Sequence, residues 1–100
     1  MNALDERQDS PLHRAASLGR TAIAKILIDN GANVNVQNRE GNTPLHLALE
    51  DEQQEVAFLL YEKGADPKIL NRAKQTAIDL CNPNIKRQLK EKFPDVGGDQ

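Results

Sequence analysis

The segment TPLHLALEDEQQEVAFLLYEKGAD, residues 43–66, decides the fold of this 100-residue chain. Thr43 is a residue type that caps helix N-termini through its side-chain oxygen, and Pro44 suits the first helical position that follows. A second apolar stretch at 56–60 ends before Gly64, and glycine readily adopts the left-handed conformation that closes helices. The segment therefore predicts two short helices joined by a tight turn.

Both signals return at a fixed distance along the chain. SPLHRA at 10–15 precedes TPLHLA at 43–48 by 33 positions, and TAIDLC follows 33 positions later at 76–81. NGAN at 30–33 returns as KGAD at 63–66 with the same step. A period of this length, carried by two independent motifs, indicates helix pairs that stack side by side, because no single pair can bury its apolar face alone.

At these residues the chain resembles the ankyrin repeat family, and the likeness extends from residue 2 to about residue 89. The resemblance implies an all-α solenoid of stacked helix–turn–helix units with projecting hairpin loops. It also implies a concave face that binds another protein. The predicted organisation is an ankyrin repeat domain at 1–93, composed of a partial hairpin at 1–6, repeats at 7–39 and 40–72 and a shortened capping repeat at 73–93, followed by a flexible tail at 94–100.

The N-terminal end starts in the middle of a unit. Residues 2–6 occupy the register of residues 35–39, so the expectation is a C-terminal fragment of a longer protein or a late start codon. A stack that starts this way lacks the polar capping repeat that normally covers its first helices. Leu12 and Ile23 would then lose their cover, and self-association through this uncapped N-terminal face is expected.

The C-terminal end has the pattern of a cap. Asn82 and Pro83 can start a last helix, and Ile85 and Leu89 give that helix one apolar stripe. Its other positions are mostly charged, as expected for the solvent-facing side of a terminal unit.

Composition narrows the class of protein further. The net charge is −2, and no apolar run approaches the length that spans a membrane. The first residues do not read as a signal peptide, and one cysteine excludes an internal disulfide, so a protein of the reducing cytosol or nucleus is expected. No aromatic residue is interleaved with the basic residues of the hairpins for base stacking, so nucleic acid is not an expected partner.

The chain offers few candidates for catalysis. His13 and His46 recur with the repeat, three residues after a capping hydroxyl, which favours a structural role, and Asp79 replaces them in the third repeat. Cys81 occupies the position of a small buried alanine and has no base near it in sequence. Neither a phosphate-binding glycine loop nor a zinc-ligand spacing occurs. The expectation is a protein that is not an enzyme and needs no metal or cofactor.

The acidic residues Glu50, Asp51, Glu52 and Glu55 depart most from the regularity of the repeat. Glu50 and Asp51 fall at the C-terminal end of a helix, where its dipole disfavours negative charge. Glu52 stands where the preceding repeat has Gly19. Two interpretations stay open. The cluster binds a basic partner surface, or it is a solvated patch in which Glu52 and Glu55 favour the start of the next helix.

The predicted protein-binding surface combines the concave helix face with the hairpin tips. Exposed leucines beside fixed charges suit protein recognition, in which apolar anchors lie within a polar rim. The predicted residues are Arg14, Leu18, Arg39, Glu40, Asn42, Leu47, Glu50, Asp51, Glu52, Arg72, Lys74 and Leu80.

A narrower resemblance concerns HRAA at 13–16, EGNTPLHLA at 40–48, the acidic stretch and the short last repeat. Together they are similar to the gankyrin type of ankyrin proteins, which chaperone assembly of the proteasome regulatory particle. The resemblance implies docking onto the C-terminal domain of a proteasomal ATPase by charge complementarity. The alternative is an adaptor module in signalling or transcription. Asn35 resembles the target of asparaginyl hydroxylases in some ankyrin proteins, and a structural role in its hairpin is the alternative.

Overall fold

The computed structural model describes residues 9–92, so the expectations for the hairpin at 1–6 and the tail at 94–100 lie outside the described residues. Within 9–92 the chain is helical and contains no strand. The elements, in order, are α1 (Pro11–Leu18), α2 (Thr21–Asp29), α3 (Pro44–Glu50), α4 (Gln54–Glu62), the 3-10 helix η1 (Ile78–Leu80) and α5 (Pro83–Lys92). The expected all-α architecture is confirmed.

The first helix of each full repeat begins with the same capping arrangement. The Ser10 side chain accepts a hydrogen bond from the backbone N–H of His13, and the ring of His13 accepts one from the backbone N–H of Ser10. Thr43 and His46 repeat this reciprocal pattern at the start of α3. Two otherwise unsatisfied amides are therefore bonded at each helix start.

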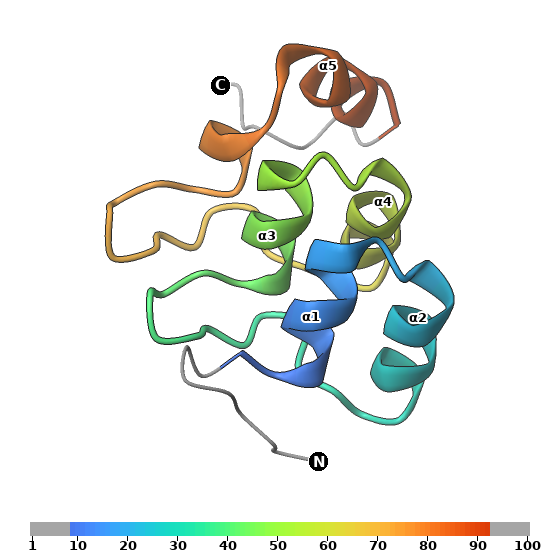
Figure 1. Ribbon diagram of the computed structural model, residues 1–100. Helices are drawn as coiled ribbons and strands as arrows, with labels where there is room; N and C mark the ends of the chain where they lie inside the picture. The colour runs from blue at the N-terminus through green and yellow to red at the C-terminus, as the bar shows by residue number, and fades with distance from the viewer. Residues whose placement is uncertain (1–8, 93–100) are drawn as a thin grey trace.

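The helix pairs stack in two layers. α1 packs against α3, and α2 packs against α4, as Figure 1 shows, with the hairpin loops projecting to one side of the helices. Ala15, Ala16 and Ala48 are buried between the layers, and their small side chains allow close approach of the helices. Leu12, which we expected to lose its cover, is only 1% exposed. That expectation is wrong because Leu12 belongs to the core cluster that α1 shares with its neighbours, not to the open end of the stack.

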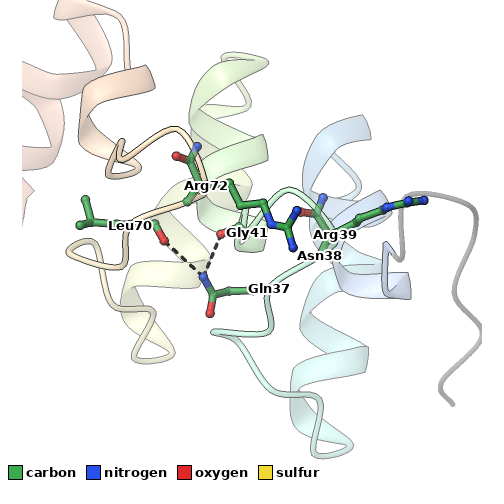
Figure 2. Close-up of a pocket in the computed structure, with 7 residues that line it drawn as sticks. Gln37, Asn38, Arg39, Gly41, Leu70 and Arg72 are labelled. Atoms are coloured by element: carbon green, nitrogen blue, oxygen red, sulfur yellow. Dashed lines mark hydrogen bonds between the residues drawn. The ribbon is translucent and has the colours of Figure 1, made fainter.

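The hairpin loops are fixed by asparagine side chains that also recur every 33 residues. Asn38 Oδ1 accepts from the backbone N–H of Glu40 and of Asn42, and Asn71 Oδ1 accepts from the equivalent amides of the next loop. Asn71 Nδ2 also donates to Asn42 Oδ1 at 2.8 Å, which ties one loop to the other. Gln37 adds a second tie, because its Nε2 donates both to Gly41 O and to Leu70 O, as Figure 2 shows.

Asn35 takes part in the same linkage. Its side-chain Oδ1 accepts from the backbone N–H of Asp66 at 2.8 Å, across to the following loop. This contact supports the structural role that we gave as the alternative to modification.

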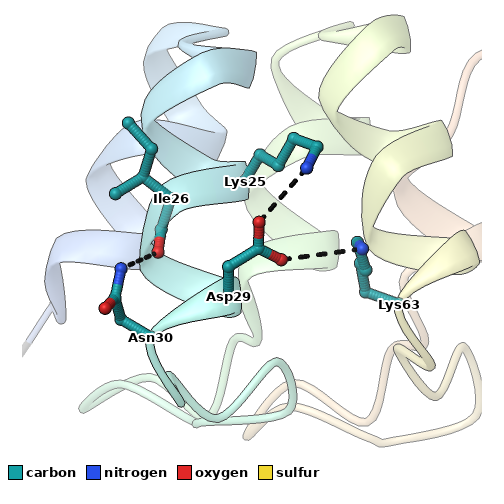
Figure 3. Close-up of polar contacts among 5 residues, drawn as sticks. All are labelled: Lys25, Ile26, Asp29, Asn30 and Lys63. Carbon is teal, nitrogen blue, oxygen red and sulfur yellow. Dashed lines mark hydrogen bonds and ion pairs between the residues drawn. The ribbon is translucent and has the colours of Figure 1, made fainter.

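On the outer side, one ion-pair cluster joins the second helices of the two repeats. Asp29 on α2 pairs with Lys25 one turn earlier at 3.1 Å and with Lys63 at the end of α4 at 3.7 Å (Figure 3). The hydrogen bond from Lys25 and the charge of Lys63 lower the pKa of the Asp29 carboxyl. The three side chains are between 34% and 58% exposed, so solvent screens the ion pairs and the cluster contributes little to stability.

In the third repeat the first helix is reduced to the single turn η1, and α5 follows directly. Asn82 Oδ1 accepts from the backbone N–H of Ile85 and so caps α5, while Ile85 and Leu89 are buried against the rest of the stack. The side chains of Gln54 and Gln88 hydrogen-bond between α4 and α5. α5 therefore closes the C-terminal end, and its charged residues face solvent.

Glu52 has the strained backbone that its register predicts. Its φ is +60°, close to the +72° of Gly19 in the preceding repeat. A residue with a Cβ in this backbone region lowers the free energy of unfolding by about 1 kcal/mol, whereas glycine does not.

We expect Glu52→Gly to raise the free energy of unfolding by about 1 kcal/mol, measured by urea denaturation. Glu55→Gly, a matched change at an exposed helical position, should instead lower it by about 1 kcal/mol. A loss of stability with Glu52→Gly would contradict the strain.

Candidate functional site

The two histidines are structural links between repeats. His13 is fully buried, and its Nδ1 accepts from the Ser10 backbone, so Nε2 carries the hydrogen and donates to Asn42 O at 2.7 Å. His46 repeats this arrangement with Gln75 O at 2.9 Å. Both nitrogens of each ring therefore form hydrogen bonds within the fold. The predicted structural role is confirmed by these contacts, and the sequence did not reveal that each ring reaches into the following repeat.

Cys81 is half-buried, and its thiol donates to the neighbouring Asn82 carbonyl. Burial raises the pKa of the Cys81 thiol to about 11, and Lys86 offsets only part of that rise. A thiol with such a pKa is almost entirely protonated at neutral pH and is a poor nucleophile. Cys81 therefore has the properties of a packing residue.

An open groove lies between the hairpin tips and the inner helix α3. It has a volume of about 470 Å³. Arg39 and Arg72 flank it from two successive tips, Glu50 lies on the helix side, and Leu80 of η1 contributes an apolar surface. The remaining lining residues are Glu40, Asn42, Asn71, Ala73 and Gln75.

A second hollow, of about 450 Å³, lies between the two hairpins themselves and shares the two arginines with the groove. Figure 2 shows Arg39 and Arg72, one from each hairpin, above Gln37. The hydrogen bond from Arg72 N to Glu40 O, at 2.9 Å, fixes the backbone at this point. The guanidinium groups are thus presented on a rigid support, which lowers the entropy lost when they bind a partner.

Six of the twelve predicted binding residues line the groove beside α3, namely Arg39, Glu40, Asn42, Glu50, Arg72 and Leu80. Leu18 at the end of α1 is 63% exposed, and Leu80 is half-buried in the groove wall. The charged residues that are exposed as predicted are Arg14, Arg39, Glu40, Glu50, Asp51, Glu52, Arg72 and Lys74.

Two of the predicted contact residues are buried instead. Leu47 is only 4% exposed because it lies on α3, which packs between α1 and η1. Asn42 is 8% exposed because it is held by Asn38 on one side and Asn71 on the other. The expectation that Leu47 is an exposed anchor is wrong, and Asn42 shapes the groove wall more than it offers a free side chain.

The acidic residues form a fixed edge beside the groove. Asp51 Oδ2 accepts from the Ser17 hydroxyl at 2.6 Å, which ties the end of α3 to α1. Gln53 Nε2 donates to Ser17 O across the same junction. Glu50 and Glu52 are exposed on either side of Asp51. The hydrogen bond from Ser17 therefore holds the charge of Asp51 in place, although this charge opposes the helix dipole.

Two groove residues, Asn71 and Ala73, were not predicted from the sequence, whereas Gln75 was expected at the hairpin tip. The signal that identifies Asn71 is its 33-residue register with Asn38, because the two side chains accept hydrogen bonds from equivalent loop amides.

Two chemical features are missing from the part of the chain that the structure describes. No helix within residues 9–92 is long and apolar enough to cross a membrane. Nor do these residues bring three or more histidine, cysteine, aspartate or glutamate side chains together as metal ligands.

Stacked helix pairs with an open groove beside projecting loops define a repeat scaffold of the kind that recognises other proteins. The family model described as "Ankyrin repeats (3 copies)" matches residues 1–71, and the chain belongs to this family. A curated relative, the ankyrin repeat-containing protein P1E11.10 of Schizosaccharomyces pombe, is 38% identical over 40 residues. That match covers 40% of this chain and 19% of the relative, so the chain spans only a small part of the relative's length.

Ankyrin repeats are protein–protein interaction modules and are generally non-catalytic, and this is the class of function that the family assigns.

Proposed function

We propose that the chain is a non-catalytic scaffold that binds a partner protein in the groove between its hairpin tips and α3. The observation that carries this proposal is the arrangement of charge around an apolar wall. Arg39 and Arg72 line the groove from the hairpin tips, Glu50 lines it from α3, and Leu80 lines it from η1. A partner segment with an apolar side chain flanked by opposite charges would match this arrangement.

The acidic edge at Glu50 and Asp51 is the part of this surface that selects a basic partner. Exposed charges at the rim of an interface act mainly on the association rate, because they steer the encounter over about one Debye length. We expect the double variant Glu50→Lys, Asp51→Lys to slow association with a basic partner by about tenfold at low salt. Stopped-flow or surface-based kinetics over a series of salt concentrations measures this effect.

A matched control separates local recognition from net charge. Glu62→Lys with Glu91→Lys makes the same change in net charge on exposed positions of α4 and α5, outside the groove. This control variant should associate at close to the unmodified rate. If the groove variant keeps its rate and its salt dependence, recognition through the acidic edge is wrong and the cluster is a solvated patch.

The likeness to gankyrin-type proteins suggests one partner in particular, the C-terminal domain of a proteasomal ATPase. A binding assay with isolated ATPase C-terminal domains tests this assignment. Binding of one such domain, weakened by Arg72→Glu in the groove but not by Glu62→Lys outside it, would support the assignment. If none of the ATPase domains binds, the assignment to the proteasome is wrong. The groove would then be tested with other proteins.

The second candidate is an adaptor that uses the same groove in signalling or transcription. Its basis is that each motif recurs throughout the ankyrin family, so the groove does not by itself select the proteasome. An interaction screen tests it with the intact groove and with the groove variants in parallel. A non-proteasomal partner that is lost with Arg72→Glu favours the adaptor.

A further inference from the structure

The outer face of α2 is apolar and exposed where its counterpart in the next repeat is buried. Ile23 is 48% exposed, whereas Val56, 33 residues later, is fully buried. Ile26 is 60% exposed, whereas its counterpart Leu59 is 9% exposed. The difference arises because α2 packs against α4 and covers it, while no element within residues 9–92 lies on the other side of α2 (Figure 1).

These residues form one continuous surface. Arg20, Ile23, Leu27 and Asn30 follow the three- and four-residue spacing of a single helix face, with Ile26 beside them. A hollow of about 520 Å³ adjoins this face at the C-terminal end of α2. Its lining includes the apolar side chains of Leu27, Ala32 and Val36. The opposite end of the stack differs, because there α5 presents charged residues to solvent.

One end of this face carries a cation and the other end is a helix C-terminus, so the two ends are complementary when two identical faces pair antiparallel. Arg20 occupies the N-cap position of α2, where a cation opposes the helix dipole. Asn30 and the last carbonyls of the helix lie at the other end. When two copies of α2 pack antiparallel, each Arg20 comes near the carboxyl end of the other copy, where the dipole favours a cation. The centre of the face, at Ile23 and Ile26, carries no charge that would be buried by the pairing.

We propose that this face, defined by Arg20, Ile23, Ile26, Leu27 and Asn30, binds a second copy of the chain in an antiparallel, two-fold arrangement. Such a contact uses the same patch on both copies, and a residue near the two-fold axis meets its own counterpart. Ile26 lies near the middle of the face and occupies that position. The proposal adds a self-association surface on the opposite side of the protein from the charged C-terminal cap, and it does not depend on the groove.

The test uses the full chain and measures its mass over a range of concentrations by sedimentation. The unmodified chain should pass from monomer to dimer as concentration rises. Ile26→Lys and Ile26→Glu should each raise the dimer dissociation constant by about tenfold or more, because like charges meet at the axis. An equimolar mixture of the two variants should recover dimer formation. Leu70→Lys, at an apolar residue that is 50% exposed on a hairpin, is the control and should dimerise normally.

Circular dichroism should show that each variant remains folded, because Ile26 is 60% exposed. Two results would overturn the proposal. One is an unmodified chain that stays monomeric at all concentrations, which would leave a further repeat or another protein as the occupant of this face. The other is a dimer that Ile26→Lys does not weaken or that the mixture of variants does not restore.

Discussion

Replacing Gly41 with alanine is expected to lower the free energy of unfolding by about 2–4 kcal/mol. A Cβ at this position would lie 2.8 Å from the backbone nitrogen of Arg72 and 3.0 Å from Asn71 Cα. Both neighbours belong to the backbone of the next hairpin, which is held by its own hydrogen bonds and cannot shift cheaply. The φ of +80° adds strain for any residue with a side chain. Urea denaturation followed by circular dichroism measures the loss.

Gly31→Ala is the matched control for Gly41→Ala. Gly31 also has a positive φ, of +95°, but a Cβ there would meet no atom within 4 Å. Only the backbone strain remains, so the expected loss is about 1–2 kcal/mol. The difference between the two variants isolates the contact between hairpins. Equal losses would mean that the hairpins do not approach each other as closely as described.

His46→Leu is expected to lower the free energy of unfolding by about 2–4 kcal/mol, as much as Gly41→Ala, although leucine fills most of the volume of histidine. The substitution removes the acceptor for the Thr43 amide and the donor to Gln75 O. At least one of these groups is buried and would be left without a hydrogen bond. The loss of stability should appear as a lower denaturation midpoint with an unchanged slope, because the unfolded state exposes the same surface.

Asp79→Ala provides the comparison for His46, because Asp79 holds the same register position in the third repeat. Its carboxylate accepts from the Thr76 amide, but the site is exposed and no bond to a following repeat depends on it. Loss of this cap should lower the free energy of unfolding by only about 0.5–1 kcal/mol. If Asp79→Ala cost as much as His46→Leu, the bridge between repeats would not be the source of the histidine's effect.

The sequence was sufficient for the parts of the fold that depend on local rules. Ser10, Thr43 and Gly19 hold the caps that their residue types predict, and Glu52 adopts the left-handed backbone that its register with Gly19 requires. The 33-residue period then predicted that the helix pairs stack, because equivalent helices must pack against one another to bury their apolar faces.

The exposure of individual side chains could not be predicted in the same way. Leu47 occupies a groove-facing register, yet it is buried by the neighbours of α3 on both sides. Asn42 belongs to a hairpin tip, yet two other asparagines enclose it. Both outcomes depend on how closely one repeat approaches the next, and a periodic pattern alone does not contain that distance.

The central claim is that each repeat is tied to the next by a histidine whose ring spans the junction. Long-range nitrogen–proton correlation spectra of the labelled chain at neutral pH test this claim most directly, together with nuclear Overhauser contacts from the two rings. The account predicts that His13 and His46 both carry their hydrogen on Nε2, with contacts from His13 to Asn42 and from His46 to Gln75. Hydrogen on Nδ1 in either ring, or an absence of contacts to the following repeat, would contradict it.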